Sequence, residues 1–187
     1  MTGTNHQEVT LSKSLLIYIP AYNCGKYIVS VIDEIPSHFW DIADILIIDN
    51  CSTDDTLVNI QKAQSETRWP QPIQVVQPEE NLGYSGSQKL AYSIVLNSTA
   101  TQRVIMLHGD GQYPPELLNV FTPYIESEHG LVYGFRDKSA YPDIEETPAS
   151  TYRIIKALSA LESFVTRHRR KEWHTGFVMY SREFLEQ

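Results

Sequence analysis

Residues 14–20 read SLLIYIP, a short apolar run with β-branched residues that a proline ends. This pattern is typical of a strand that is buried on both faces. Apolar residues then recur at helical spacing from Tyr27 to Ile35, just before Pro36. A buried strand followed directly by a helix is the repeating unit of an α/β protein.

The same alternation continues along the chain. Further apolar runs predict strands at residues 44–49, 73–77, 103–107, 131–134 and 174–181. Helical periodicity separates them, with one helix opened by a capping box at residues 52–55 and another started by Pro114 and Pro115. Strands this apolar, separated by helices, predict an α/β fold with a mostly parallel sheet and helices on both faces.

The 187 residues contain no linker, so the sequence predicts one domain over residues 1–187. The last residues, SREFLEQ, read as the start of a helix, and we therefore expect that the domain is truncated at its C-terminus. Residues 136–150, RDKSAYPDIEETPAS, have no apolar period and are rich in charge, proline and small side chains. They predict a long mobile loop, which at this length is typically functional.

The charge balance limits the partners of the chain. Fifteen Lys and Arg stand against twenty-three Asp and Glu, which gives a net charge of −8. Nucleic acid is therefore excluded as a main partner, and a polyphosphate ligand needs a local cation. One basic cluster, RHRRK at residues 167–171, is either a solvated face or a contact for an anionic acceptor or lipid headgroups.

The chain has only two cysteines, Cys24 and Cys51, too few for a disulfide scaffold and not spaced as a zinc site. A cytoplasmic location fits this usage. No apolar run reaches about 18 residues, and the first thirteen residues are too polar for a signal peptide. We expect a soluble protein, with peripheral attachment to the cytoplasmic face of a membrane as the other option.

Polar side chains gather where four of the predicted strands end. Parallel strands bind ligands at their carboxyl ends, so these segments should meet along one edge of the sheet. The segments are Pro20–Asn23, Asp49–Ser52, Asn81–Gly83 and His108–Asp110.

His108 and Asp110 are two residues apart, and in an extended segment such side chains point the same way. A carboxylate beside an imidazole suits a divalent cation, and Gly109 between them would let a ligand approach the backbone. The alternative is that Asp110 and Gly111 form only a turn, with His108 a buried histidine. The spacing alone leaves these two readings about even.

Other polar residues at this edge also allow two readings. Asp49 could accept hydrogen bonds from a base or ribose, or it could cap the next helix together with Ser52. The segment Gly83–Gly86 could offer N–H groups to an anion, or it could be only a loop before the next helix, since it lacks the usual phosphate-binding motifs. Lys89 is either a phosphate contact or a solvated residue, and Glu172 and His174 are either a base and a metal ligand or a polar edge.

Five motifs taken in order resemble the inverting family 2 glycosyltransferases and, within them, the dolichyl-phosphate mannosyltransferase-like branch. The motifs are IPAYN (19–23), IIDNCSTDDT (47–56), NLGYSGSQKLAY (81–92), HGDGQYPPE (108–116) and EWHTGFVMYS (172–181). The resemblance covers about residues 14–187. It implies a GT-A (Rossmann-like) fold, a UDP- or GDP-linked sugar donor, and Mg²⁺ or Mn²⁺ as cofactor.

The resemblance also implies roles for individual residues. Asp110 would hold the metal that bridges the two phosphates, with His108 in the place of the first Asp of the family's DxD motif and His174 as a third ligand. Asn50 stands where a second Asp is usual, and Val178 stands where the mannosyltransferase pattern has Arg. The donor would contact Pro20, Ala21, Tyr22, Asn23, Asp49, Asn50, Gly83, Lys89 and Gly109.

The implied reaction is a single displacement with inversion at the anomeric carbon, to a polyprenyl-phosphate or saccharide acceptor of the cell envelope. Glu172 is the candidate general base for a hydroxyl acceptor. The loop at residues 136–150 would form a lid on the acceptor side.

Two other classes fit the sequence less well. A sugar nucleotidyltransferase needs a glycine-rich basic loop after the first strand, and YNCGKY at residues 22–27 has one Gly and one Lys. A non-catalytic nucleotide-sugar binding or assembly module would keep the motifs without turnover. His108 and Val178 are the departures that favour this second alternative.

Overall fold

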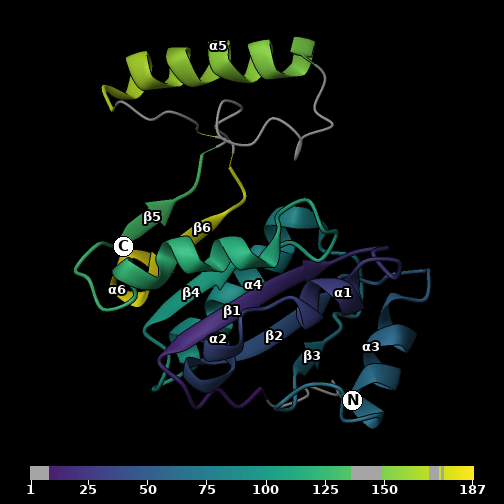
Figure 1. Cartoon of the computed structure of the whole chain (residues 1–187). Helices are drawn as coiled ribbons and strands as arrows, with labels where there is room; N and C mark the ends of the chain where they lie inside the picture. The colour runs from purple at the N-terminus through teal and green to yellow at the C-terminus, as the bar shows by residue number, and fades with distance from the viewer. Residues whose placement is uncertain (1–8, 136–148, 169–172, 174) are drawn as a thin grey trace, which may run out of the picture.

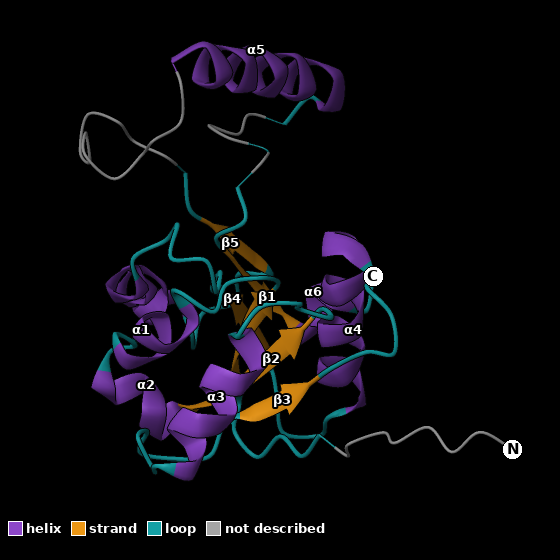
Figure 2. Ribbon diagram, turned by 90° about the vertical axis from the view of Figure 1, so that its right-hand side faces the viewer, coloured by secondary structure: helices purple, strands orange, loops and turns teal. Residues whose placement is uncertain are grey.

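A six-stranded sheet with helices on both faces forms the body of the protein (Figures 1 and 2). The computed structural model describes residues 9–135, 149–168, 173 and 175–187. The strands are β1 (Leu15–Ala21), β2 (Ala43–Asp49), β3 (Gln74–Val76), β4 (Arg103–Met106), β5 (Leu131–Tyr133) and β6 (Val178–Ser181). The helices are α1 (Ile28–Asp33), α2 (Ser37–Ile42), α3 (Thr56–Ser65), α4 (Gly83–Asn97), the 3₁₀ helix η1 (Pro115–Tyr124), α5 (Ala149–Thr166) and α6 (Arg182–Leu185).

The strand order is β3-β2-β1-β4-β6-β5. The first four strands in this order are parallel, whereas β6 runs antiparallel to both β4 and β5. Ala21 lies opposite Asp49, so β1 and β2 end at the same level. The predicted α/β class and mostly parallel sheet are confirmed.

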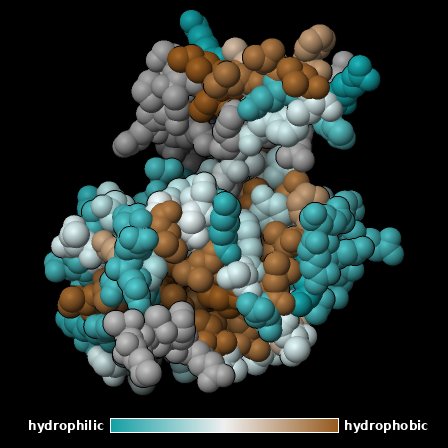
Figure 3. Space-filling view, turned by 180° about the vertical axis from the view of Figure 1, so that it is seen from behind, coloured by the Kyte–Doolittle hydropathy of each residue, from teal (hydrophilic) through white to brown (hydrophobic). Residues whose placement is uncertain are grey.

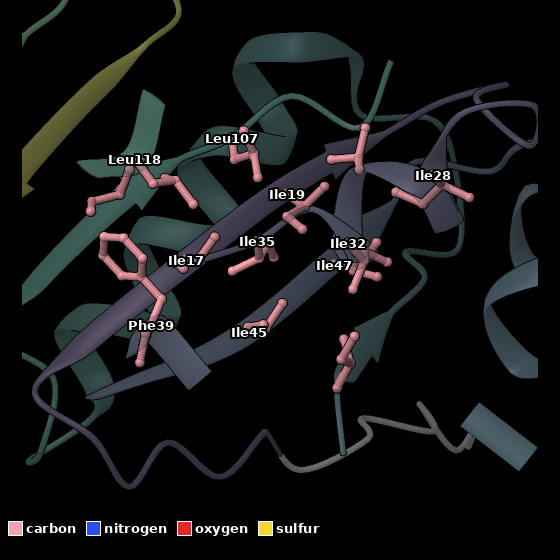
Figure 4. Packing of buried hydrophobic residues seen from close by; sticks show 14 of the residues in the cluster. Ile17, Ile19, Ile28, Ile32, Ile35, Phe39, Ile45, Ile47, Leu107 and Leu118 are labelled. Atoms are coloured by element: carbon pink, nitrogen blue, oxygen red, sulfur yellow. The ribbon is translucent and has the colours of Figure 1, made fainter. Parts of the chain in front are cut away.

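The two faces of the sheet are packed by different helices. Odd-numbered residues of β1, such as Ile17 and Ile19, pack with residues of α1, α2, α3 and η1, as Figure 4 shows in part. Even-numbered residues, such as Leu16 and Tyr18, pack with α4 and α6. Because both faces are covered, β1 reads as a continuous apolar run, and each fully buried aliphatic side chain contributes about 1.5–3 kcal/mol.

The structure differs from the predicted elements in four places. Helix α2 was not predicted; it is only one and a half turns long, and it buries Phe39 and Trp40 after a proline. The helix after Pro114 is a 3₁₀ helix that contains Pro123, which has no N–H to donate to an α-helical bond. Helix α4 begins at Gly83, so Gly83–Gly86 form its first turn and not a preceding loop. The last strand begins at Val178 and not at residue 174.

The loop predicted at residues 136–150 lies largely outside the described residues, and α5 already begins at Ala149. The assignment of residues 1–187 to one domain stays a prediction. Across residues 9–135, 149–168 and 175–187, no helix has both the length and the apolar character needed to cross a membrane.

Candidate functional site

A cavity of about 350 Å³ lies where β1 and β2 end and α4 begins. This is the carboxyl edge of the parallel strands, and the volume falls within the range of about 300–1,000 Å³ that is usual for small-molecule sites. Predicted site residues among those lining it are Pro20, Ala21, Tyr22, Asn50, Gly83, His108 and Asp110. The lining residues that were not given a role in the predicted site are Cys24, Asn81, Tyr84 and Ser87.

The end of β1 supplies one wall of the cavity. The side chain of Tyr22 is 54% exposed there, so one aromatic ring is free of the core. Asn23 does not line the cavity. Its φ is +49°, its N–H donates to Ser52 Oγ (2.9 Å), and its Oδ1 accepts from the Thr53 N–H (2.8 Å). Asn23 therefore ties the end of β1 to the loop that follows β2.

Asp49 is the last residue of β2, is fully buried and does not line the cavity. Gln77 Nε2 donates to Asp49 Oδ2 (2.8 Å), while the backbone N–H of Ser52 (3.3 Å) and its hydroxyl both donate to Asp49 Oδ1. Both carboxylate oxygens thus accept hydrogen bonds from protein groups. These bonds offset the cost of burying the charge. The structure places Asp49 among loop-fixing groups and not on the cavity wall.

The capping box predicted at residues 52–55 is wrong. Asp55 is the N-cap of α3 and its side chain makes no capping hydrogen bond. Asp54 instead accepts from the N–H groups of Thr56 (3.0 Å) and Gly25 (3.0 Å), and hydrogen bonding from Thr56 lowers the pKa of the Asp54 carboxyl. Ser52 is used by Asp49 and not by the helix.

Asn50 joins the end of β2 to the start of α4. Its Nδ2 donates to Asn81 Oδ1 (2.9 Å), and its Oδ1 accepts from the Leu82 N–H (2.8 Å). Asn81 Oδ1 also accepts from the Gly83 N–H (2.8 Å). An amide at position 50 donates and accepts at once, whereas a carboxylate would only accept and would face Asn81 Oδ1.

The first turn of α4 forms the opposite wall. Gly83 has a φ of +67°, which glycine adopts without strain, and Tyr84 and Ser87 line the cavity one turn apart. Ser87 Oγ lies 2.6 Å from the hydroxyl of Tyr18, and burial raises the pKa of Tyr18 above its usual value. Lys89 is exposed and does not line the cavity.

His108 follows β4 and lies among aromatic rings. Its ring centroid is 5.9 Å from that of Tyr84 and 5.1 Å from that of Tyr113, which in turn stacks on Phe177. A Cβ added to Gly176, just before β6, would collide with the His108 ring and lie 3.2 Å from the Tyr84 hydroxyl. Gly176 therefore lets the chain pass close behind His108, a role that the glycine in HTGF did not reveal.

Gly109 packs against the body of the protein. Its N–H donates to the Pro20 carbonyl (3.2 Å), and an added Cβ would lie 2.9 Å from Ile28 Cδ1 and 3.3 Å from Cys24 Sγ. Packing thus accounts for the glycine, and contact of Gly109 with a ligand stays a prediction. Burial raises the pKa of the neighbouring Cys24 thiol to about 11, so this thiol is protonated at neutral pH.

Asp110 carries an exposed carboxylate at the cavity. Its Oδ1 accepts from the Gln112 N–H (3.1 Å), and Gly111 has a φ of +75°. The turn that the sequence suggested is therefore present, and it holds the carboxylate at the cavity. The two readings of Asp110, turn residue and ligand-facing residue, are compatible.

The expected metal ligands are only partly described. His108 and Asp110 both line the cavity, while Glu172 and His174 lie outside the described residues. Within residues 9–135, 149–168, 173 and 175–187, no cluster of three or more His, Cys, Asp or Glu side chains could hold a metal ion.

Comparison with protein families gives one match. The family described as "Glycosyl transferase family 2" matches residues 16–187, nearly the whole chain. No curated protein matches the sequence.

Among solved structures, the fold is similar to glucosyl-3-phosphoglycerate synthase from Mycobacterium tuberculosis. Its complex with Mn²⁺, UDP and phosphoglyceric acid has a TM-score of 0.65 at 19% identity, over 91% of this chain and 56% of that one. Its complex with Mn²⁺, UDP-glucose and phosphoglyceric acid has a TM-score of 0.66 at 18% identity, over 91% and 57%. The chain thus spans little more than half the length of these proteins, and the likeness concerns the fold.

Proposed function

Because the chain belongs to glycosyl transferase family 2, we propose that its cavity binds a nucleotide-diphosphate sugar and that it transfers the sugar with inversion. The observation that carries the proposal is the meeting of the β1 end, the Asn50–Asn81 joint and Asp110 at one cavity of suitable size. The similar synthase structures contain UDP or UDP-glucose, which supports a uridine donor over a guanosine one.

The base and ribose would lie along Pro20, Ala21 and Tyr22. The exposed ring of Tyr22 offers a face for stacking on a base. We assign Asp49 to positioning, since Ser52 and Gln77 occupy its carboxylate and hold the loop on which Asn50 is carried. Gly83 and the first turn of α4 would lie beside the diphosphate, where helix N–H groups favour anions.

Charge argues for a cation at Asp110. The cavity lining contains this carboxylate and no Lys or Arg among the described residues, so it would repel a diphosphate by itself. A carboxylate and an imidazole from His108 fit Mg²⁺ or Mn²⁺, with the donor phosphates and water completing the ligand set. The bound ion would stabilise negative charge on the leaving diphosphate.

In the proposed displacement, an acceptor oxygen forms a bond to the anomeric carbon as the bond from that carbon to the diphosphate oxygen breaks. The acceptor would be a polyprenyl phosphate, as in the dolichyl-phosphate mannosyltransferase-like branch, or a saccharide. A hydroxyl acceptor passes its proton to a base, for which Glu172 is the candidate, whereas a phosphate acceptor is already anionic. With two free cysteines in the chain, we place the reaction in the cytoplasm.

A non-catalytic nucleotide-sugar binding module is the second candidate. The observation that favours it is His108, whose ring packs near those of Tyr84 and Tyr113 and which replaces a carboxylate that would bind a cation more strongly. Turnover separates the two candidates, because a binding module shows donor affinity without release of UDP. A sugar nucleotidyltransferase would instead release pyrophosphate.

The test is calorimetric titration of UDP, GDP and their sugar conjugates, with and without Mn²⁺. We expect Mn²⁺-dependent binding of one nucleotide, weakened about tenfold or more in Asp110→Asn. Asp41→Asn is the matched control, because Asp41 is an exposed carboxylate on α2, at the opposite end of β2. Equal affinity in the Asp110 and Asp41 variants would contradict the assignment of Asp110.

A further inference from the structure

Helix α5 turns its large apolar side chains toward solvent. Ile154, Leu158, Leu161 and Val165 are exposed, and their spacing of four, three and four residues places them in one stripe along the helix. Phe164, beside this stripe, is 82% exposed. Figure 3 shows apolar side chains gathered over this helix.

The other side of α5 faces its own chain. The backbone N–H of Trp173 donates to the buried Ser159 Oγ (3.3 Å), and its indole Nε1 donates to Ser163 Oγ (2.9 Å). A helix that covers a core turns its apolar side inward and its polar side outward. In α5 the serines face inward and the apolar stripe faces outward, and Figures 1 and 2 place the helix apart from the sheet.

Charge along this segment differs from charge in the rest of the protein. Residues 153–171 contain six Lys or Arg and one Glu, a net charge of +5 within a chain of net charge −8. Arg153 flanks the stripe and Arg167 directly follows Thr166, the last residue of the helix, whereas Lys156 lies on the side of Ser159 and Ser163. A helix that combines an apolar stripe with basic side chains is typical of attachment to anionic lipid.

We propose that α5 is a docking helix for the surface of an anionic lipid bilayer. The stripe would enter the boundary between headgroups and acyl chains, while the basic side chains contact lipid phosphates. A second copy of the chain fits this surface less well, because two facing stripes would bring two segments of charge +5 together. The docking does not depend on the proposed transfer reaction.

The segment that follows α5 leads back to the cavity. The chain returns from α5 to β6 through Gly176, which contacts the region of His108 and Tyr84 at the cavity. A bilayer bound by α5 would therefore lie on the side of the sheet where β6 enters. If the acceptor is a polyprenyl phosphate, a point that rests on the proposed function, its phosphate would be offered from that same surface.

The test is flotation of the whole chain with vesicles of phosphatidylcholine, with or without about 30% phosphatidylglycerol. We expect binding only to the anionic vesicles, decreasing with salt. Phe164→Asp should weaken it about tenfold or more, and the double variant Arg153→Glu/Arg167→Glu by a similar factor. The matched control is Val58→Asp, because Val58 is 60% exposed on α3 and lies outside the stripe.

Several results would overturn the proposal: no flotation of the wild-type chain, equal flotation with neutral vesicles, or equal losses in Phe164→Asp and Val58→Asp. Dimerisation in lipid-free solution that Phe164→Asp abolishes, without flotation of the wild type, would assign the stripe to a second copy. UDP titration of each variant separates this inference from the donor site. Vesicle binding without nucleotide binding would support α5 as a lipid-binding helix and would contradict the proposed transferase function.

Discussion

The segments that follow β2 and β4 meet at the same cavity, yet the carboxylate at the end of β2 is buried and the one after β4 is exposed. Asp49, at the end of β2, is fully buried and both its oxygens accept hydrogen bonds from Ser52 and Gln77. Asp110, after β4, is exposed and uses one oxygen in a turn. A carboxylate at a strand end is thus either part of the framework or available to a ligand, and its neighbours decide which.

The largest effect should come from Asp49→Ala. It removes a fully buried carboxylate and leaves the Gln77 amide and the Ser52 hydroxyl without their acceptor, and we expect a loss of about 3 kcal/mol in the free energy of unfolding. Asp110→Ala should change it by less than about 0.5 kcal/mol, because Asp110 is exposed. Urea denaturation measures both, and similar losses in the two variants would break the contrast.

Gly176→Ala should displace the His108 ring in the segment that follows β4. The added methyl meets the His108 ring and the Tyr84 hydroxyl, so we expect a loss of about 2 kcal/mol from overpacking. Most of that loss should return in the double variant Gly176→Ala/His108→Ala, in which the ring is removed. Thermal unfolding of the two variants tests this, and a double variant no more stable than Gly176→Ala would contradict the proposed contact.

Asn50→Asp tests the hydrogen bond between the side-chain amides of Asn50 and Asn81, which links the end of β2 to the start of α4. We expect a loss of about 1–2 kcal/mol and faster amide hydrogen exchange over residues 81–87, because the carboxylate would face Asn81 Oδ1. Adding Asn81→Ser should recover part of both, since a hydroxyl can donate to the introduced carboxylate and still accept from the Gly83 N–H. Unchanged exchange in Asn50→Asp would show that the joint does not hold the start of α4.

The smallest effect concerns pH and Cys24, whose thiol packs against Gly109 in the segment after β4. Its pKa is raised by burial to about 11, above the value of about 9 for a free thiol. The unfolded thiol therefore ionises first, so the contribution of Cys24 is complete below about pH 9 and is lost between about pH 9 and 11. Between about pH 9 and 11, the free energy of unfolding of the wild type should decrease by about 1–2 kcal/mol more than that of Cys24→Ala. Parallel pH profiles would contradict it.

The sequence predicted best what depends on local pattern. The runs around Ile17, Ile47 and Ile105 are apolar throughout because both faces of the sheet are covered, and they located β1, β2 and β4. The clustering of the strand ends was predicted because parallel strands place their carboxyl ends at one edge of the sheet. Seven predicted site residues line the cavity, from Pro20 to Asp110.

What the sequence missed depends on contacts between distant segments. For Asp49 the sequence left two readings open, a ligand contact or a cap of the next helix, and one of its hydrogen-bond donors is Gln77, twenty-eight residues later. Gly176 has no local signal, because the reason for it is the ring of His108, in the segment that follows β4. The capping box was misread since the hydroxyl of Ser52 bonds Asp49 in place of the helix.

The place of β6 in the sheet has a consequence for synthesis. Strand β6 comes last in the sequence, but it lies between β4 and β5. Among the described strands, β5 pairs only with β6, so during translation β5 emerges before its partner, and one edge of β4 also stays open until residues 178–181 leave the ribosome. The nascent chain therefore exposes the strand edges that β6 later covers, and chaperone binding should be strongest in that interval.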